Sequence, residues 1–212
     1  MISFLHKLIC GIWQWAACLN DRIFRGNADF SGWMTQENAG FSQDHGNQYQ
    51  PSTDALVRIL KRYPISQEDR ILDIGCGKGK AMYLMSRYPF GAVRGYDLSE
   101  TLTEIANDNF RKLGLDDRCR AFRADAMEFQ DYDEYNYFYL FNPFPEEVFR
   151  VMLDHLMDSL KRRPRSCTMI YLHPVCHEYL IQNTPFKLTW KKKSWIDWFD
   201  YYCYSYTVPE DQ

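Results

Sequence analysis

The chain has 212 residues, of which 46% are hydrophobic and 25% charged, and a formal net charge of −3. This length and composition suffice for one globular domain with a sizeable core, and no segment has the composition of a disordered tail. The small net charge excludes a basic field over the whole surface, so a nucleic-acid partner would have to bind a local patch.

Residues 2–19 are the first apolar stretch of the chain, but they include His6, Lys7 and Gln14 and lack an A-x-A cleavage pattern. Their apolar residues recur at helical spacing, which predicts an amphipathic helix rather than a transmembrane segment. The helix could pack on the core, close over a substrate or contact a membrane surface as a peripheral anchor. We favour packing or a lid, because its polar face is only weakly cationic.

Residues 20–50 are rich in Gly, Asn, Asp and Gln, a composition typical of a long loop with short helices. We therefore interpret 1–50 as a lid or cap and 51–212 as the main domain. From Ser52 the pattern becomes regular, and Ser52 or Thr53 is a candidate N-cap for a helix that ends at Pro64.

Strands and helices alternate from there to about residue 172. Strands are predicted at 70–74, 92–96, 119–123, 135–141 and 167–172, with helices at 81–87, at 102–113 behind a Thr101–Glu104 capping box, and from Pro145. Two long strands follow at 186–195 and 199–208. The sequence thus predicts an α/β fold with a doubly wound, mostly parallel seven-stranded sheet, an antiparallel C-terminal strand and an N-terminal helical segment.

A glycine loop, DIGCGKG at 73–79, lies between the first strand of the sheet and the helix that follows it. An open parallel sheet presents its ligand crevice at such a position. A phosphate-binding P-loop is excluded, because Ala81 follows Lys80 where Ser or Thr is required and the first glycine is at the wrong distance. The dinucleotide fingerprint fits poorly, because Lys80 stands at the position of its third glycine.

Aspartates stand at the ends of three successive strands: Asp73, Asp97 and Asp125. Both dinucleotide-binding and S-adenosylmethionine (SAM)-binding folds use an acid after the second strand for ribose hydroxyls, so Asp97 alone does not separate them. Asp125, followed by Ala126, could meet the amino group of an adenine. Any one of these aspartates could be an ordinary cap or turn residue, but the set together with the glycines points to a nucleoside ligand.

These motifs resemble those of the class I, Rossmann-like SAM-dependent methyltransferases from about Tyr49 to the C-terminus. More narrowly, YQPS at 49–52, DIGCGKG and YLFNPFP at 139–145 are similar to a group of bacterial methyltransferases of unassigned substrate. The resemblance implies SAM as the cofactor. It implies that Asp73 and the segment Gly75, Cys76, Gly77 and Gly79 hold the methionine end, Asp97 with Leu98 the ribose, and Asp125 with Ala126 the adenine.

The segment Asn142-Pro143-Phe144-Pro145 resembles the N/D-P-P-Y/F tetrad of methyltransferases that act on amino or amide nitrogen. In that tetrad the Asn side chain and a Pro carbonyl accept hydrogen bonds from the target nitrogen. Here Phe144 occupies the third position and Pro145 follows it, so the aromatic residue is moved by one place. We expect Asn142 to orient the acceptor nitrogen beside the cofactor and Tyr49 to close the pocket, although Asn142-Pro143 could also be a simple strand-to-helix turn.

Other groupings favour structural interpretations. Cys76 between two glycines is expected to pack rather than to act as a nucleophile, because methyl transfer needs no covalent enzyme intermediate. His173, Cys176 and His177 are not expected to bind a metal, since Pro174 interrupts them and no second ligand cluster follows. The lysines 191–193 with Trp190, Trp195 and Trp198 could bind nucleic acid or an acidic partner, or simply alternate on an exposed strand.

The seven cysteines are odd in number and widely spread, with no C-x-x-C pair and no secretory leader, which predicts a reducing, cytoplasmic location. We therefore hypothesise a SAM-dependent methyltransferase of EC class 2.1.1 that acts on an amine or amide nitrogen of an unidentified protein or small molecule. The alternative is a non-catalytic protein that binds SAM, another adenosine ligand or NAD on the same sheet. The sequence does not identify the acceptor or the oligomeric state.

Overall fold

The computed structural model describes residues 16, 19–21, 23–193 and 199–208. Seven strands form one sheet in the order β3-β2-β1-β4-β5-β7-β6. The strands are β1 (Arg70–Ile74), β2 (Ala92–Asp97), β3 (Cys119–Arg123), β4 (Tyr137–Phe141), β5 (Cys167–Leu172), β6 (Lys187–Lys192) and β7 (Tyr201–Tyr206). Strands β1 to β5 pair in parallel, and β7 runs antiparallel to β5 and β6. The predicted sheet is confirmed.

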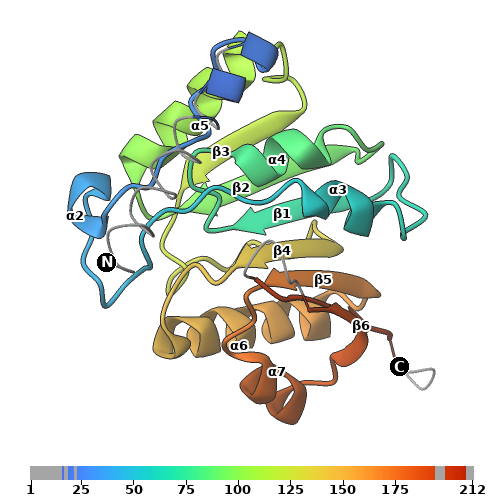
Figure 1. Ribbon diagram of the computed structural model, residues 1–212. Coiled ribbons are helices and arrows are strands. Elements are labelled where there is room, and N and C mark those ends of the chain that lie inside the picture. Colours follow the sequence, from blue (N-terminus) through green and yellow to red (C-terminus); the bar gives the residue numbers. More distant parts are fainter. Residues whose placement is uncertain (1–15, 17–18, 22, 194–198, 209–212) are drawn as a thin grey trace.

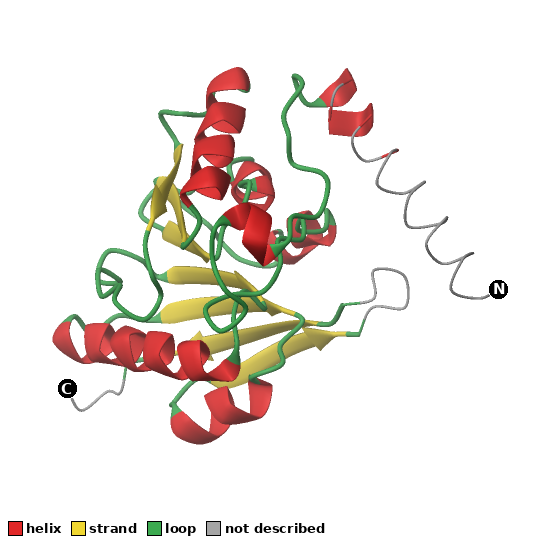
Figure 2. Ribbon diagram, turned by 90° about the vertical axis from the view of Figure 1, so that its left-hand side faces the viewer, coloured by secondary structure: helices red, strands yellow, loops and turns green. Residues whose placement is uncertain are grey.

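Helices cover both faces of this sheet (Figure 1). They are α2 (Gln36–Ala39), α3 (Ala55–Leu60), α4 (Lys80–Met85), α5 (Glu100–Lys112), α6 (Glu146–Arg162) and α7 (His177–Asn183). The buried residues of α3, α4 and α5 share one core cluster, whereas α6 and α7 contribute to another. Figure 2 shows the twisted sheet with helices on its two sides.

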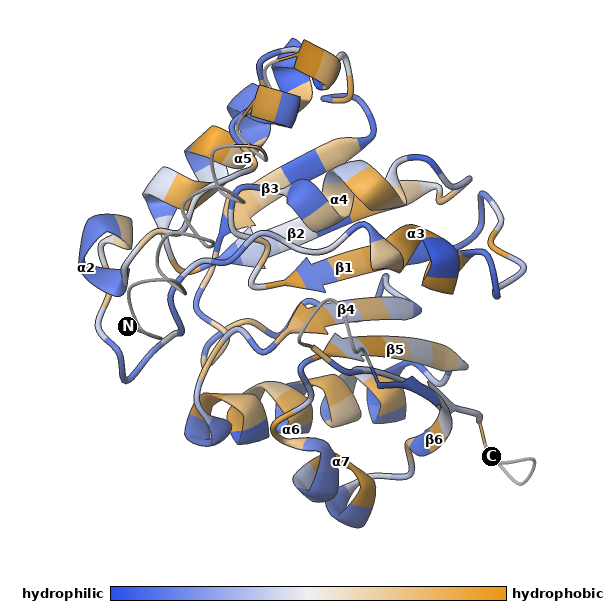
Figure 3. Cartoon of the chain, in the orientation of Figure 1, coloured by the Kyte–Doolittle hydropathy of each residue, from blue (hydrophilic) through white to orange (hydrophobic). Residues whose placement is uncertain are grey.

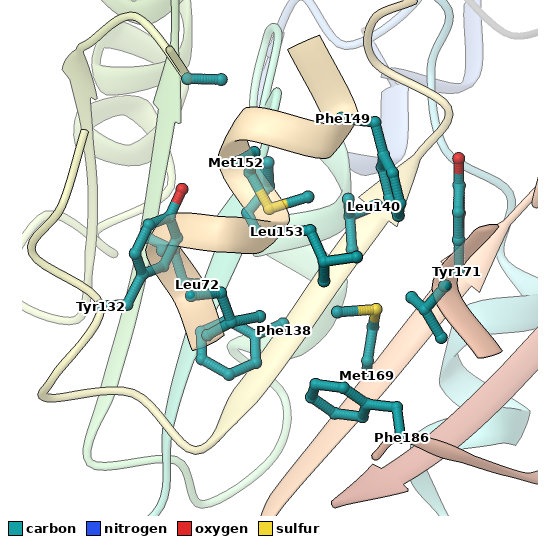
Figure 4. Packing of buried hydrophobic residues seen from close by; sticks show 14 of the residues in the cluster. Leu72, Tyr132, Phe138, Leu140, Phe149, Met152, Leu153, Met169, Tyr171 and Phe186 are labelled. Atoms are coloured by element: carbon teal, nitrogen blue, oxygen red, sulfur yellow. The ribbon is translucent and has the colours of Figure 1, made fainter. Parts of the chain in front are cut away.

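The core on the α6 side consists of large apolar side chains that interlock between helix and sheet (Figure 4). Phe149, Met152 and Leu153 of α6 pack against Phe138 of β4 and Met169 of β5, and all five are at most 1% exposed. Burial of side chains of this size contributes about 1.5–3 kcal/mol each. This packing fixes the register of β4 and β5 and therefore the position of the residues at their carboxyl ends.

Several local predictions need correction. The N-cap of α5 is Ser99, whose hydroxyl accepts from the Leu102 N–H, so the capping box predicted at Thr101 is wrong. Neither Ser52 nor Thr53 caps α3, whose N-cap is Asp54. The helix after the glycine loop spans Lys80–Met85 rather than 81–87, and the last two strands are shorter than predicted. The predicted helix over residues 2–19 lies, apart from Ala16 and Leu19, outside the described residues.

Candidate functional site

The glycine loop turns sharply at the carboxyl end of β1, where Gly75 and Cys76 both donate backbone hydrogen bonds to the carbonyl oxygen of Tyr96, at 2.9 Å each. Gly75 has a positive φ of 76°, and a Cβ there would lie 2.3 Å from the Cβ of Pro143. At Gly77 a Cβ would lie 2.3 Å from the ring of Tyr49. The glycines therefore allow close packing of the loop between two other parts of the site.

Asp97, the last residue of β2, holds this loop through one carboxylate oxygen and the start of α5 through the other. One oxygen accepts from the Gly77 N–H at 2.9 Å and the other from the Ser99 N–H at 3.0 Å. Burial raises the pKa of Asp97, and the backbone hydrogen bonds from Ser99, Gly77 and Leu98 oppose that rise. A carboxylate oxygen can accept more than one hydrogen bond, so Asp97 retains lone pairs for a ligand.

Asp73, inside β1, has a buried carboxylate oxygen, Oδ2, that has no hydrogen-bond partner among the described residues. Burial, and after it the neighbouring Asp97, raise the pKa of Asp73 well above its ordinary value. A buried acceptor without a donor is costly unless a ligand supplies one. The ammonium group of SAM would supply such a donor, so this residue fits the cofactor that the sequence resemblance implies.

Asp125 lies two residues beyond the end of β3. Its Oδ1 accepts from the Met127 N–H at 2.9 Å, and Oδ2 makes no hydrogen bond to a described residue. Ala126 beside it is buried at 6% exposure. A small buried residue next to a carboxylate with one unused oxygen could accommodate a flat base and accept a hydrogen bond from its amino group.

Asn142 and His173 follow the last paired residues of β4 and β5, since Phe141 pairs with Leu172 in the parallel ladder. Both have positive φ, 37° at Asn142 and 53° at His173, which is uncommon for residues other than glycine. Strained backbone conformations cluster at active sites and ligand clamps. The Asn142 side chain makes no hydrogen bond to any described residue.

Asn47 contacts the turn after β4 at two points. Its side-chain Nδ2 donates to the Asn142 carbonyl and its backbone N–H donates to the Pro143 carbonyl, both at 2.8 Å. The Pro143 carbonyl, which the tetrad of the nitrogen methyltransferases uses for the substrate, is thus already engaged by the protein. Asn47 was not predicted from the sequence, because its contacts join residues about 95 positions apart.

These elements meet around one cleft of about 470 Å³. Seven predicted site residues line it: Tyr49, Gly75, Asp97, Leu98, Asp125, Ala126 and Asn142. Asp73 and Cys76 border a small hollow that shares Gly75 with the cleft, whereas Gly77 and Gly79 line neither space. Gly79 instead packs beneath α5, where a Cβ would lie 2.5 Å from the ring of Phe110.

The opposite wall of the cleft is aromatic. The Phe199 ring packs edge-on against Phe141 and His173, with centroid separations of 5.0 and 5.3 Å. All three residues line the cleft. The wall lies beside Asn142 and provides an apolar surface on the side of β4 and β5.

Ionic and hydrogen-bond contacts connect the segment of residues 29–49 to the glycine loop. The Lys78 ammonium group, only 7% exposed, contacts the two Asp29 carboxylate oxygens at 2.9 and 3.0 Å and the Ser31 carbonyl at 3.2 Å. The fully buried Asn109 side chain accepts from the Asp29 N–H and donates to the Asp29 and Lys78 carbonyls. Tyr49 donates its hydroxyl to the Phe30 carbonyl at 2.7 Å, so this hydroxyl already has a partner.

The described cysteines are buried, and one histidine of the 173–177 segment has a hydrogen-bond partner. Cys76, Cys119, Cys167, Cys176 and Cys203 are free and buried, and burial raises the pKa of the Cys76 thiol. His177 is hydrogen-bonded to the Tyr204 hydroxyl at 2.8 Å. Across the described residues, no three His, Cys, Asp or Glu side chains are grouped to hold a metal ion, and no described helix is long and apolar enough to cross a membrane.

Comparison with known proteins places this geometry in context. Residues 71–163 match the family model of a methyltransferase domain. The 27-O-demethylrifamycin SV methyltransferase of Amycolatopsis mediterranei is 31% identical over 133 residues, which cover 62% of this chain and 43% of that protein. The chain thus spans less than half the length of the curated relatives that it matches first.

Two solved structures show the same fold. An RNA methyltransferase from Salinibacter ruber in complex with S-adenosylhomocysteine aligns with a TM-score of 0.56 at 15% identity, covering 77% of this chain and 96% of the other. An O-methyltransferase from Bacillus cereus, also with S-adenosylhomocysteine, aligns with a TM-score of 0.56 at 15% identity, covering 74% and 80%. The chain therefore has the Rossmann-like fold of these proteins.

Proposed function

We propose that this chain is a SAM-dependent methyltransferase that methylates an amine or amide nitrogen. The observation that carries the proposal is the convergence of four strand ends on one cleft: the glycine loop after β1, Asp97 after β2, Asp125 after β3 and Asn142 after β4. An alternative NAD-binding role is not favoured, because the loop lacks the third dinucleotide glycine and the similar proteins are methyltransferases.

In this proposal each acid binds a different part of the cofactor. Asp73 accepts from the ammonium group through its unpartnered Oδ2, Asp97 binds the ribose hydroxyls, and Asp125 with Ala126 binds the adenine. Leu98 lies against the ribose, and Gly75 permits close approach of the methionine end. SAM supplies a methyl group on a positively charged sulfur, which makes the methyl carbon an electrophile.

Asn142 is proposed to orient the acceptor. Its side chain has no described hydrogen-bond partner, so its amide oxygen is available to a donor N–H while the nitrogen lone pair stays free to attack. The aromatic wall of Phe141, His173 and Phe199 would exclude water from the reacting atoms. Tyr49 is proposed to close the site with its ring, since its hydroxyl is engaged by Phe30.

Isothermal titration calorimetry with SAM, S-adenosylhomocysteine and NAD tests the cofactor. We expect both adenosyl compounds to bind and NAD to bind more weakly; tighter binding of NAD would refute the proposal. Tritium transfer from methyl-labelled SAM into the RNA, protein and small-molecule fractions of a cell extract then identifies the acceptor. Label that enters only oxygen-linked products would refute the nitrogen assignment.

A further inference from the structure

A basic surface lies along α3 and the edge strand β6, apart from the cofactor residues. These segments contain seven cations: Arg58, Lys61, Arg62, Lys187, Lys191, Lys192 and Lys193. All except Lys192 are exposed. Lys191 lies on the face of β6 opposite Lys192. The ion pairs found among the described residues use other cations, so none of these seven is neutralised by a described carboxylate within 4 Å. Most of β6 is coloured as hydrophilic in Figure 3.

The two elements of this surface meet where Arg62 lies over the ring of Trp190, with its guanidinium carbon 4.6 Å from the ring centroid. Arg58 lies in α3, and Arg62 lies in the turn just after it. Trp190 and Lys192 lie on the same face of β6, because side chains alternate along a strand. Trp190 thus links Arg62, in the turn after α3, to the face of β6 that carries Lys192.

Stacking on Trp190 holds the Arg62 guanidinium in a fixed plane, which reduces the conformational entropy lost when it binds an anion. A planar guanidinium matches two oxygens of a phosphate at once. Several cations without ion-pair partners, one of them Arg62 stacked on Trp190, suit a repeating phosphodiester backbone better than isolated carboxylates on a protein surface.

One end of the basic surface lies on the same edge of the sheet as the cleft. Lys192 pairs with Tyr201 of β7, and Tyr201 pairs with Leu172 of β5, the residue before His173. Two strand spacings place Lys192 about 10 Å from Leu172. Since β6 runs in the same direction as β5, its lysine-rich end lies at the carboxyl edge of the sheet, where Asn142 and His173 line the cleft.

We propose that this basic surface binds the backbone of a single-stranded nucleic acid and brings one of its bases to the cleft. A base inside a duplex cannot reach a recessed site without leaving the stack, which favours a single-stranded acceptor. The base nitrogens would be the atoms presented to Asn142. The presentation of a base to Asn142 rests on the proposed function, whereas the binding of the nucleic acid to the basic surface does not.

The test is fluorescence anisotropy with a labelled 20-nucleotide single-stranded RNA of mixed sequence, over a series of salt concentrations and without cofactor. The full chain is compared with the Arg62→Gln/Lys192→Gln variant. Each lost phosphate contact lowers the slope of log K against log salt by about 0.7, so the double variant should lose about 1.4. With an unchanged intercept at 1 M salt, this corresponds to roughly 25-fold weaker binding at 0.1 M.

The matched control is Arg111→Gln/Lys161→Gln, which removes the same charge from two exposed cations that already pair with Asp108 and Asp158. It should leave both affinity and slope close to those of the unchanged protein. Equal weakening in both variants, or no RNA binding at 50 mM salt, would overturn the proposal. So would equally tight binding of polyglutamate, which would assign the surface to an acidic protein.

Calorimetry with S-adenosylhomocysteine on the same preparations separates the two proposals. RNA binding without S-adenosylhomocysteine binding retains the basic surface and refutes the methyltransferase assignment. The reverse result retains the methyltransferase and refutes the nucleic-acid surface. A thermal melt of each variant confirms that the substitutions leave the fold intact.

Discussion

The carboxylate of Asp97 accepts a hydrogen bond from the backbone N–H of Gly77 at 2.9 Å, so the end of β2 holds the loop that follows β1. The same side chain accepts from Ser99, the N-cap of α5. In the proposed function this residue also binds the ribose. Asp97 thus combines support of the loop with contact to the ligand, and its substitution should affect both stability and binding.

We predict that Asp97→Ala weakens S-adenosylhomocysteine binding by at least 100-fold and lowers the free energy of unfolding by about 1–3 kcal/mol, because two buried N–H groups lose their acceptor. Calorimetry and urea unfolding measure the two effects. Asp125→Ala is the control for ligand contact alone: it should weaken binding roughly tenfold and change stability by less than about 1 kcal/mol. An unchanged dissociation constant for Asp97→Ala would refute its role.

Asp73→Asn should stabilise the ligand-free protein at neutral pH while weakening S-adenosylhomocysteine binding. The buried Asp73 carboxylate is desolvated and lies near Asp97, which raises its pKa in the folded state. A carboxyl whose pKa is raised by folding stays protonated up to a higher pH in the folded state than in the unfolded state. Its contribution to stability is therefore lost as pH rises from the ordinary Asp range to the raised value.

Urea unfolding at several pH values from about 4 to about 8 tests the direction of this pH dependence. The free energy of unfolding should fall more steeply with rising pH in the unchanged protein than in Asp73→Asn. At neutral pH the variant should be more stable by on the order of 1 kcal/mol. A variant that is less stable at every pH would show that Asp73 has a donor partner in the free protein.

Local sequence patterns predicted the sheet well. The strand at Arg70–Ile74 and the glycine loop were identified because apolar runs and glycine spacing depend on neighbouring residues alone. The cap of α5 was misplaced because Ser99 is fixed by Asp97, which is itself held against Gly77. A capping pattern in the sequence does not record that contact.

Contacts between distant residues explain what the sequence did not predict at the site. The Ser52 hydroxyl pairs with the Tyr139 hydroxyl at 2.7 Å instead of capping α3, and Thr53 pairs with Tyr201. Lys78 binds Asp29, 49 residues away. The aspartates at the strand ends were predictable because parallel strands bring their carboxyl ends together. The position of residues 29–49 was not predictable, because it depends on contacts between side chains that are far apart in the sequence.

Asp29→Ala should loosen residues 29–49 from the glycine loop. It leaves the buried Lys78 ammonium group with the Ser31 carbonyl as its described hydrogen-bond acceptor and the Tyr49 ring 5.6 Å away. The backbone bonds of residue 29 to Asn109 remain. Since Asp29 is about half exposed, we expect a modest loss of about 1 kcal/mol in unfolding free energy. Cleavage within residues 29–49 during limited proteolysis should become several-fold faster.

The matched control for this experiment is Asp44→Ala, which removes an exposed carboxylate from the same segment. It should change neither the unfolding free energy nor the cleavage rate. Saturating S-adenosylhomocysteine should slow cleavage in the unchanged protein if the segment closes over the cofactor. Equal cleavage rates for Asp29→Ala and the unchanged protein would show that the Lys78 contact does not anchor the segment.

The backbone of Asn142 determines how its role should be tested. At its φ of 37°, alanine would add strain to the loss of the side chain, whereas glycine accepts this conformation. We predict that Asn142→Gly keeps S-adenosylhomocysteine affinity within about twofold and reduces methyl transfer by at least roughly 100-fold, about 2.7 kcal/mol of barrier. Asn142→Asp retains an acceptor oxygen at the same place and should keep more activity than the glycine variant. Tritium transfer into the acceptor fraction, measured together with calorimetry, distinguishes acceptor orientation from cofactor binding. If Asn142→Gly loses methyl transfer and S-adenosylhomocysteine affinity to the same extent, Asn142 contacts the cofactor instead.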